Sequence, residues 1–390
     1  MSDKMLKRIK FIALGLVLIS LIIVGQKFYN YRQYKEKVVA GPGVTNVTKL
    51  GDYFEPIKDT VNDCNIYILD SGNPGGTAMV IGGAHPEEPA ANISAQLLVE
   101  NVVPKKGKLI VAIWSNRSAS LNTRPGEAYP MYYHVKTEWG EKKFRMGSRW
   151  SSPLDSWPDP EVYIHYPSKQ MLSYKDIRNA NRTWPGKKDG GITEQTCYAF
   201  TELIEKEKVD LFIDLHEAEL EYSVINTIVA HESARDVASM SSMILTADQF
   251  EVPISMEYSP KTLHGLSHRE VGDHTRAASL LFETAEPMLD RVRGVTDEEL
   301  LMRGKDEFVR KAGDYGLLYS PIDKEGWPIE RRVGRHNSTL VEVAKQWSML
   351  NPTKAIELSN VPQYNELIKN GVGPYFKNPA EVEEDRVYLE

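Results

Sequence analysis

The sequence predicts an α/β fold in which a mixed, mainly parallel central sheet is flanked by helices, with a transmembrane helix at the N-terminus. Between residues 65 and 290, short apolar runs alternate with helical stretches, which is typical of strands buried on both faces. An uncharged run of fifteen residues lies at Phe11–Gly25. The chain has 390 residues, 41% of them hydrophobic and 26% charged, so it is globular in composition and long enough for a large core.

The N-terminal segment, residues 1–30, is predicted to anchor the chain in the cell membrane. Four basic residues lie among the first ten, and the apolar run with its flanks approaches the roughly 20 residues that span a bilayer. The basic flank is expected to stay cytoplasmic, which places the remainder outside. No small-x-small cleavage site follows Gly25 directly, although a cleaved signal peptide and a secreted product stay the alternative.

The strands and helices of the main domain follow in order. Strands are predicted for NIYILDSG (65–72), GTAMVIGG (76–83), KLIVAIWSN (108–116), VDLFIDLHEA (209–218), VINTIVAHE (224–232) and AASLLFETAEP (277–287). Helices are predicted for EEPAANISAQLLVENVV (87–103), TEQTCYAFTELIEKEK (193–208) and SARDVASMSSMILTADQF (233–250).

The remaining segments define the domain organisation. Residues 31–50 are polar and then marked by Gly and Pro, which predicts a linker. The main domain is expected to span 51–293, and 294–390 to form a mostly helical extension packed on it. Residues 122–175 are rich in Trp, Tyr, Pro and Ser and are too long for an ordinary connection, which predicts a functional insertion.

Charge and cysteine usage exclude some classes of function. The net charge is -7 and no basic stripe is visible, so nucleic acid is not an expected partner. Cys64 and Cys197 are the only cysteines, and the sequence leaves open whether they form a disulfide or stay buried thiols. Two cysteines cannot build a cysteine-rich zinc cluster, so a metal site here would use histidine and carboxylate ligands.

The first chemical motif lies where an apolar strand gives way to a helix. Gly82 and Gly83 allow a sharp turn, Pro86 suits a first helical position, and His85 precedes Glu88 by three residues. Both side chains can then reach one point, where a divalent cation would relieve the cost of a desolvated carboxylate. The alternative is a solvated helix start with acidic residues favoured by the helix dipole.

Two further strand ends carry polar residues. Asp214 and His216 stand near the end of an apolar strand and alternate onto one face, so His216 could be a third ligand that Asp214 orients. A hydrogen-bonded polar pair at a strand tip is the plain alternative. Glu283 follows a second apolar run, where burial would raise its affinity for a proton, as a general base or acid requires. Glu286 is the less favoured alternative.

A loop with the sequence DIRNANRTWPG supplies an amide and a guanidinium side by side. Asn181 and Arg182 suit the capture of a substrate carboxylate, and Arg178 lies nearby.

In this order, H-x-x-E, N-R, D-x-H and a late Glu, the chain resembles the M14 zinc carboxypeptidase superfamily and in particular its succinylglutamate desuccinylase/aspartoacylase branch. GGAHPEE matches the opening Gly-Gly-x-His-x-x-Glu of the family, NRTWPG matches Asn-Arg-x-x-Pro-Gly, and Asp214 to His216 match Asp-Leu-His. The resemblance covers about residues 65 to 290 and implies a zinc-peptidase-like fold with 51–293 as the catalytic domain.

The resemblance also implies the roles of individual residues. One Zn²⁺ would be held by His85, Glu88 and His216, Glu283 would be the catalytic glutamate, and Asn181 with Arg182 would bind the carboxylate. Zinc lowers the pKa of water and polarises an amide carbonyl, while an arginine steadies the oxyanion.

Two positions depart from the family pattern. Asn179 stands where the branch commonly has Asp, and the oxyanion arginine usually lies further upstream than Arg178. Arg178 is the candidate, and Arg145, Arg149 and Arg124 in the insertion compete with it. His134 and His165 are expected to be surface or structural residues, and His231 could be a core residue with its hydrogen bonds satisfied. For His264, His268 and His274 simple hydrogen bonding is the favoured interpretation, and one of them could line the pocket.

These observations predict a membrane-anchored zinc amidohydrolase that deacylates an N-acyl amino acid or a related carboxylate-bearing amide. A metallocarboxypeptidase acting on peptides, including cell-wall peptides, is the alternative among enzymes. The alternative from another class is a catalytically silent surface-binding module. The acyl group, the amino acid and the oligomeric state are left open.

Overall fold

The computed structural model describes residues 2–122, 130–288 and 296–390 of the chain. Its internal contacts divide the chain into two units, Met1–Glu36 and Lys37–Glu390. The first unit contains the helix α1 (Asp3–Gln33), whose N-terminus is capped by the Ser2 side chain. By length and composition, α1 is the one helix among the described residues that could cross a membrane, and a signal sequence would pass the same test.

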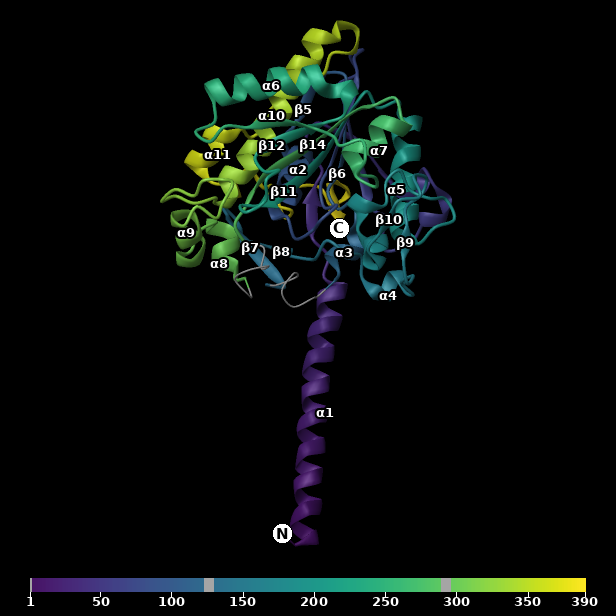
Figure 1. Cartoon of the computed structure of the whole chain (residues 1–390), viewed down its shortest axis with the longest axis vertical. Helices are drawn as coiled ribbons and strands as arrows, with labels where there is room; N and C mark the ends of the chain where they lie inside the picture. The colour runs from purple at the N-terminus through teal and green to yellow at the C-terminus, as the bar shows by residue number, and fades with distance from the viewer. Residues whose placement is uncertain (1, 123–129, 289–295) are drawn as a thin grey trace. The chain divides into compact units, whose positions relative to one another are not determined.

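The second unit is built on a mixed sheet, as the alternation of apolar runs predicts (Figure 1). Four of the neighbouring pairs, β13–β12, β14–β11, β11–β4 and β4–β6, are parallel, and the other three are antiparallel. In spatial order the eight strands are β13 (Ser255–Tyr258), β12 (Thr227–Ala230), β14 (Ala278–Glu286), β11 (Leu211–Glu219), β4 (Thr77–Ile81), β6 (Lys108–Ala112), β3 (Asn65–Asp70) and β2 (Val44–Lys49).

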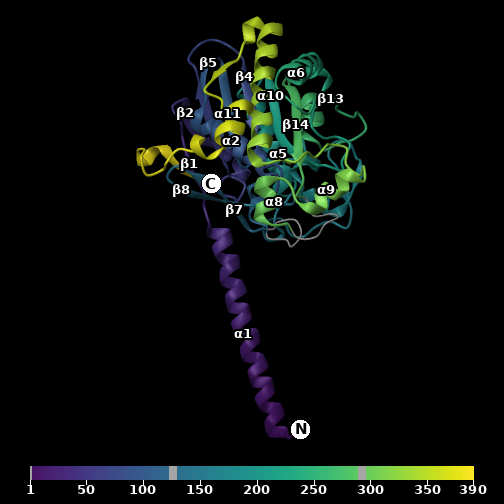
Figure 2. The same cartoon turned by 90° about the vertical axis from the view of Figure 1, so that its left-hand side faces the viewer.

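Helices cover both faces of this sheet. One face packs against α2 (Pro89–Asn101), α6 (Arg235–Asp248) and α10 (Ile329–Leu350), and Figure 2 shows α10 running across β14. The other face packs against α5 (Ile192–Lys206) and α7 (Ser267–His274). All six predicted strands and all three predicted helices are confirmed within these elements.

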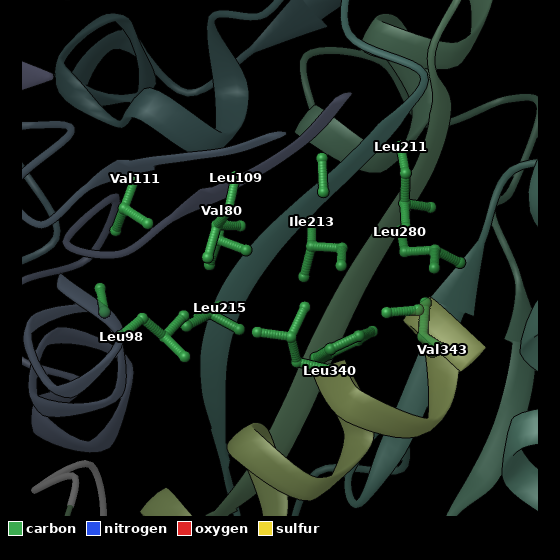
Figure 3. Packing of buried hydrophobic residues seen from close by; sticks show 14 of the residues in the cluster. Val80, Leu98, Leu109, Val111, Leu211, Ile213, Leu215, Leu280, Leu340 and Val343 are labelled. Carbon is green, nitrogen blue, oxygen red and sulfur yellow. The ribbon is translucent and has the colours of Figure 1, made fainter. Parts of the chain in front are cut away.

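Two apolar layers follow from the alternation of side chains along the strands. Figure 3 shows the layer beneath α2 and α10, whose labelled members are Val80, Leu98, Leu109, Val111, Leu211, Ile213, Leu215, Leu280, Leu340 and Val343. The neighbours of these strand residues, such as Met79 and Phe212, point to the opposite layer and meet Phe200 of α5. Burial on both faces explains why the strands are continuously apolar in the sequence.

The segment expected to be a linker contains two strands. Residues 37–39 form β1 (Lys37–Val39), which pairs with β16 (Val387–Leu389), and β2 joins the central sheet. The glycines here mark close packing, since a Cβ on Gly43 would lie 2.1 Å from the carbonyl oxygen of Val102. Gly and Pro in this stretch therefore reflect tight contacts made by the folded chain.

The C-terminal segment adds both helices and strands. It holds α8 (Glu298–Arg303), α9 (Glu307–Asp314), α10 and α11 (Tyr364–Asn370), together with β15 (Glu357–Ser359), which pairs with β5 (Val103–Lys106). Because α10 contributes Leu340 and Val343 to the main core, this segment is part of the packed unit. The domain boundaries that the sequence suggests stay a prediction.

The described part of the insertion consists of short elements. They are β7 (Tyr132–Thr137), β8 (Gly140–Arg145), α4 (Pro153–Ser156), β9 (Tyr163–Ile164), β10 (Met171–Leu172) and the 3-10 helix η3 (Tyr174–Arg178), with α3 (Arg117–Ser120) before them. Its surface is rich in large apolar side chains, including exposed Trp157, Met171 and Tyr174.

The two cysteines are buried free thiols in the layer beneath α5. Burial raises the pKa of both Cys64 and Cys197, which keeps them protonated and unreactive. Of the two possibilities that the sequence left open, the structure has the buried thiols.

Candidate metal centre

His85 and Glu88 lie in the turn between β4 and α2, at the carboxyl end of a parallel strand. The turn depends on Gly83, which has φ +67° and no room for a Cβ, because one would lie 2.8 Å from the carbonyl oxygen of Ile113. The helix begins later than expected, at Pro89, with Glu88 as its N-cap. Pro86 is therefore not the first helical residue; Pro89 takes that position, where its missing N–H costs nothing.

His216 meets this turn from β11. One ligand atom from each of His85, Glu88 and His216 lies within 4.8 Å of the others, and all three residues are buried. His85 Nδ1 lies 2.7 Å from Glu88 Oε1, and His216 Nδ1 lies 2.8 Å from Glu88 Oε2. The two imidazole rings are nearly perpendicular, with centroids 4.7 Å apart. Residues 131 positions apart in the chain thus converge around one carboxylate, as the sequence predicted.

Each imidazole is held from behind by a different acceptor. His85 Nε2 lies 2.8 Å from Asn179 Oδ1, which also accepts from the backbone N–H of Asn181. His216 Nε2 lies 3.1 Å from Asp214 Oδ2. An amide oxygen only accepts, so His85 donates its Nε2–H, and its Nδ1 faces Glu88. Asn179 thus orients His85 by a hydrogen bond, whereas the Asp214 carboxylate lies behind His216 as a close ionic contact without hydrogen-bond geometry.

The charges of these groups explain why a cation fits. Burial lowers the pKa of His85, so this ring is neutral, and its Nδ1 turns a lone pair toward the Glu88 carboxylate. Burial alone would raise the pKa of Glu88, but the two histidines outweigh it and hold that pKa well below the usual range. The Glu88 Oε1 oxygen and the His85 Nδ1 lone pair face each other, which a shared metal ion would satisfy, and two imidazoles with one carboxylate suit zinc.

Glu283 stands beside the triad on β14. It pairs with His216 in the register of β11 and β14, and its Oε2 is enclosed without a hydrogen-bond partner among the described residues. Burial raises the pKa of Glu283 well above its ordinary value; His216 opposes this, while Glu88 and Asp214 add to it. An unpartnered acid with high proton affinity next to a metal triad can take and return a proton.

Glu286, the less favoured alternative, has a different environment. Both of its carboxylate oxygens are buried without a hydrogen-bond partner, and burial raises its pKa, with Glu217 adding to the effect. Three residues along a strand from Glu283, it projects from the opposite face of the sheet. Glu286 is therefore a protonated, enclosed acid away from the face that carries His216.

Of the candidate arginines that the structure describes, Arg149 is the one whose charge affects the pKa of a triad residue, His85. Its Nε lies 2.6 Å from Glu87 Oε1, and its charge acts on the pKa of both His85 and Arg182. Burial alone would lower the pKa of Arg149, but Glu87 and Glu88 raise it, so the guanidinium stays charged.

The other arginines of the insertion are directed elsewhere. Arg178 Nε lies 3.0 Å from Asp159, and its Nη1 donates to the Ser151 carbonyl oxygen. Arg145 lies over the Trp114 ring and donates to the backbone of Glu390. Arg124 lies outside the described residues.

Asn181 and Arg182 lie in the 3-10 helix η4 (Ala180–Arg182) next to the orienting Asn179. Asn181 Oδ1 accepts from the N–H of Ser267, so its amide NH₂ is the group that can donate to a ligand. Arg182 donates to the Asn181 carbonyl oxygen, and no carboxylate of the described chain forms an ion pair with it. Burial lowers the pKa of Arg182, and Arg149 adds to the effect, so an anion here would be favourable.

Several residues at the centre were not found from the sequence. Glu217 donates its N–H to Glu88 Oε2, while its own carboxylate binds the N–H of Ala90 and Arg332 of α10 at 2.8 Å. His336, also on α10, is buried with an unpartnered Nε2, and burial lowers its pKa to about 3. Glu217 directly follows His216 and could have been noticed, whereas nothing in the sequence around 332–336 indicates the site.

The other histidines mostly have structural partners. His134 pairs with Glu298, His231 bonds Ser233 and Asp273, and His165 Nε2 lies 2.6 Å from the Trp184 carbonyl oxygen. Of the 260–275 group, His268 is the residue whose pKa His216 affects: burial lowers it to about 3, and the charge of His216 adds to the effect. The His268 Nδ1 bonds Ser259.

Comparison with known proteins gives matches of fold only. No protein-family model and no curated protein sequence matches the chain. Solved structures that match include a succinylglutamate desuccinylase from Silicibacter sp. TM1040 (18% identity, 56% of this chain and 52% of that chain, TM-score 0.34). An aspartoacylase family protein from Mesorhizobium loti also matches (18% identity, 57% and 55%, TM-score 0.34).

A third match is a metallo-carboxypeptidase from Burkholderia cenocepacia (12% identity, 83% of this chain and 68% of that chain, TM-score 0.44). The chain thus spans about half the length of the first two proteins and about two thirds of the third. Structural matches of low identity thus include succinylglutamate desuccinylase/aspartoacylase proteins and metallo-carboxypeptidases.

Proposed function

We propose that this protein is a zinc-dependent amidohydrolase that deacylates an N-acyl amino acid or a related carboxylate-bearing amide. The observation that carries the proposal is the meeting of His85, Glu88 and His216 with an unpartnered Glu283, from three separate segments of the chain. Metal-assisted hydrolysis needs a metal site and a nearby acid at one place, and a protein that only binds ligands has no physical need for the acid.

In this proposal zinc, when bound by His85, Glu88 and His216, polarises the scissile carbonyl and makes water a stronger acid. Glu283 takes a proton from water as the water oxygen bonds to the carbonyl carbon, and its carboxyl then gives that proton to the leaving nitrogen as the C–N bond breaks. The products are a carboxylic acid and a free amino acid.

The role of Arg149 is to offer its guanidinium to the oxyanion, and this replaces Arg178 in the role that the sequence suggested. Arg149 acts on the charges of the triad, whereas Arg178 is paired with Asp159. Arg182 and the amide of Asn181 hold the substrate carboxylate. The 3-10 helix that carries them keeps both residues next to Asn179, which orients a metal ligand.

A metallocarboxypeptidase activity is the second candidate, and one observation favours it. The insertion presents exposed large side chains, among them Trp157, Met171 and Tyr174, which could contact a peptide on the acyl side of the scissile bond. Both reactions release an amino acid with a free carboxylate, so they differ only in the group on the acyl side.

The test uses the full chain purified in detergent, first with zinc and then with a chelator. N-acetyl and N-succinyl amino acids are compared with N-acyl dipeptides, and each substrate is paired with its α-carboxamide. We expect hydrolysis of the N-acyl amino acids, loss of activity with chelator, recovery with zinc, and at least a 100-fold lower kcat/KM for each carboxamide. Activity that survives chelation would contradict the metal mechanism, and preference for dipeptides would favour the second candidate.

The place of action follows from the N-terminal helix in this proposal. α1 would act as an uncleaved anchor and keep the Lys37–Glu390 unit outside the cytoplasmic membrane. N-terminal sequencing of the purified protein distinguishes the anchor from a cleaved signal peptide, because only the anchor preserves residues 1–30.

A further inference from the structure

A second group of potential metal ligands lies away from the triad. One ligand atom from each of His165, His264 and Glu270 lies within 4.8 Å of the others, and His165 and Glu270 are buried. His165 comes from the insertion, His264 from the loop before α7, and Glu270 from α7 itself. We propose that these three residues form a second site for a divalent transition-metal ion of the zinc class.

The Glu270 carboxylate resembles Glu88 in how it is used. His264 Nδ1 lies 2.8 Å from Glu270 Oε1, and His274 Nε2 lies 3.1 Å from Oε2. The backbone N–H of Gly265 also donates to Oε1, which fixes the carboxylate in place. Burial alone would raise the pKa of Glu270, but its bonds with His274, Gly265 and His264 lower it, so the group carries the negative charge that a cation needs.

His165 is held as a metal-binding histidine usually is. Its Nε2 lies 2.6 Å from the Trp184 carbonyl oxygen, so Nε2 carries the proton and donates it. Its Nδ1 then keeps a lone pair, which accepts from the Ser168 hydroxyl at 2.7 Å. Burial lowers the pKa of His165, so the ring is neutral, and an ion at Nδ1 would take the place of the Ser168 hydroxyl hydrogen.

The ring of His264 completes the set. It stacks on His165, with centroids 5.9 Å apart and an angle of 23° between the planes. Zinc bonds of about 2.0–2.1 Å place neighbouring ligand atoms roughly 3.4 Å apart, so the cluster would close by about 1 Å around an ion. His264 can make this movement because its side chain is 29% exposed. Two imidazoles and one carboxylate select zinc, cobalt or nickel over magnesium or calcium.

The second site adjoins the segment that carries the candidate substrate arginine. The Trp184 N–H donates to the Gly265 carbonyl oxygen, and Gly265 packs so closely on Arg182 that a Cβ would lie 2.2 Å from the Arg182 carbonyl oxygen. His165 contacts the Trp184 carbonyl oxygen, and Gly265, next to His264, contacts the Trp184 N–H. An ion bound by His165 and His264 would therefore stabilise the position of the segment that contains Arg182 and Trp184. The metal site itself does not depend on the proposed hydrolase activity.

The test counts zinc bound to the full chain in detergent, with zinc alone as the probe after removal of all metal. Four proteins are compared: the wild type, His264→Asn, His85→Asn and, as a matched control, His134→Asn. His134 also pairs with a glutamate, Glu298, but it has no second imidazole nearby in the described structure. Glu270→Gln is a second variant of the new site, and thermal unfolding of each protein checks that it folds.

We expect two zinc ions per wild-type chain, the second with a weaker Kd. His264→Asn and Glu270→Gln should weaken the second ion at least tenfold and leave the first in place, while His85→Asn does the reverse and His134→Asn changes neither. In His85→Asn, zinc should still raise the Tm. A second ion that survives both His264→Asn and Glu270→Gln, or a wild type that binds only the ion removed by His85→Asn, would overturn the proposal. Loss of the first ion alone would contradict the proposed function and leave this site standing.

Discussion

Two histidine–glutamate clusters among the described residues have similar ligands and differ in their surroundings. In each, one glutamate uses its two oxygens to hold two imidazole nitrogens, Glu88 with His85 and His216, and Glu270 with His264 and His274. The first cluster lies at strand ends, is fully buried, and has the unpartnered acid Glu283 beside it. The second lies between loops and α7, with His264 partly exposed. Ligands alone make a place for a metal; the adjacent acid makes chemistry possible.

The largest expected effect tests the acid that distinguishes the first cluster. Glu283→Gln should lower kcat by at least 1,000-fold and leave zinc content unchanged, because the amide keeps the shape but cannot carry a proton. Kinetics with an N-acyl amino acid and metal analysis of the same sample measure both. Glu286→Gln is the matched control: Glu286 is enclosed and protonated, so its amide should retain activity. Equal losses in the two variants would contradict the role of Glu283.

The next effect concerns the arginine that serves the first cluster. Arg149→Lys should lower kcat by about 100- to 1,000-fold, as the removal of one oxyanion donor typically does, with little change in zinc binding. Arg178→Lys is the comparison, and it should stay within a few-fold of the wild type because Arg178 is directed at Asp159 and Ser151. The reverse ranking in kcat/KM would restore Arg178 as the oxyanion residue.

A smaller effect concerns the groups that orient the two imidazoles of the first cluster. Asp214→Asn should weaken zinc binding by about 10- to 100-fold, since the supporting carboxylate makes His216 a better ligand. Asn179→Asp should strengthen zinc binding by up to tenfold, because it places a carboxylate behind His85 as well. Competition with a zinc chelator gives both affinities. If both variants shift the Kd for zinc in the same direction, a carboxylate behind the imidazole does not strengthen zinc binding at both Asp214 and Asn179.

The smallest effect is on how the stability of the fold depends on pH. The pKa shifts of His268 and His274, one near each cluster, change this dependence in opposite directions. Burial lowers the pKa of His268, near the first cluster, to about 3, so stability from this group is full above the unfolded pKa of about 6.5 and is lost as the pH falls toward 3. The hydrogen bond between His274 and Glu270 raises the pKa of His274. The contribution of His274 to the free energy of unfolding is therefore full below the unfolded pKa of about 6.5 and is lost as the pH rises through the folded pKa.

Thermal unfolding between pH 4 and pH 8 measures these two contributions. In His268→Gln the Tm should fall by a few degrees less than in the wild type when the pH is lowered. In His274→Gln the Tm should be lower than in the wild type by about a degree, and only at low pH, since the His274 side chain is partly exposed. The matched variant His134→Gln tests the background effect of removing a surface imidazole. Identical pH profiles for all three would rule out both contributions.

The sequence by itself determined the fold class and the members of the first cluster. Continuous apolar runs separated by helices require a sheet covered on both faces. Polar residues at the ends of such runs carry a desolvation cost unless a hydrogen bond, an ion pair or a metal ion offsets it. His85, Glu88, His216 and Glu283 could therefore be found by their positions at strand ends. Asp214 could be found as an orienting residue because it shares a strand face with His216.

Only the tertiary structure decided which side chains from distant loops face these residues. The proposal of Arg149 in place of Arg178, the support of His85 by Asn179 and the pairing of Glu217 with Arg332 all depend on how the insertion and α10 pack against the sheet. The second cluster joins His165 to His264 and Glu270, which stand 99 and 105 residues further along the chain and share no local pattern with it. Periodicity follows from the local geometry of the chain, whereas contacts between loops follow from the packing of the whole core.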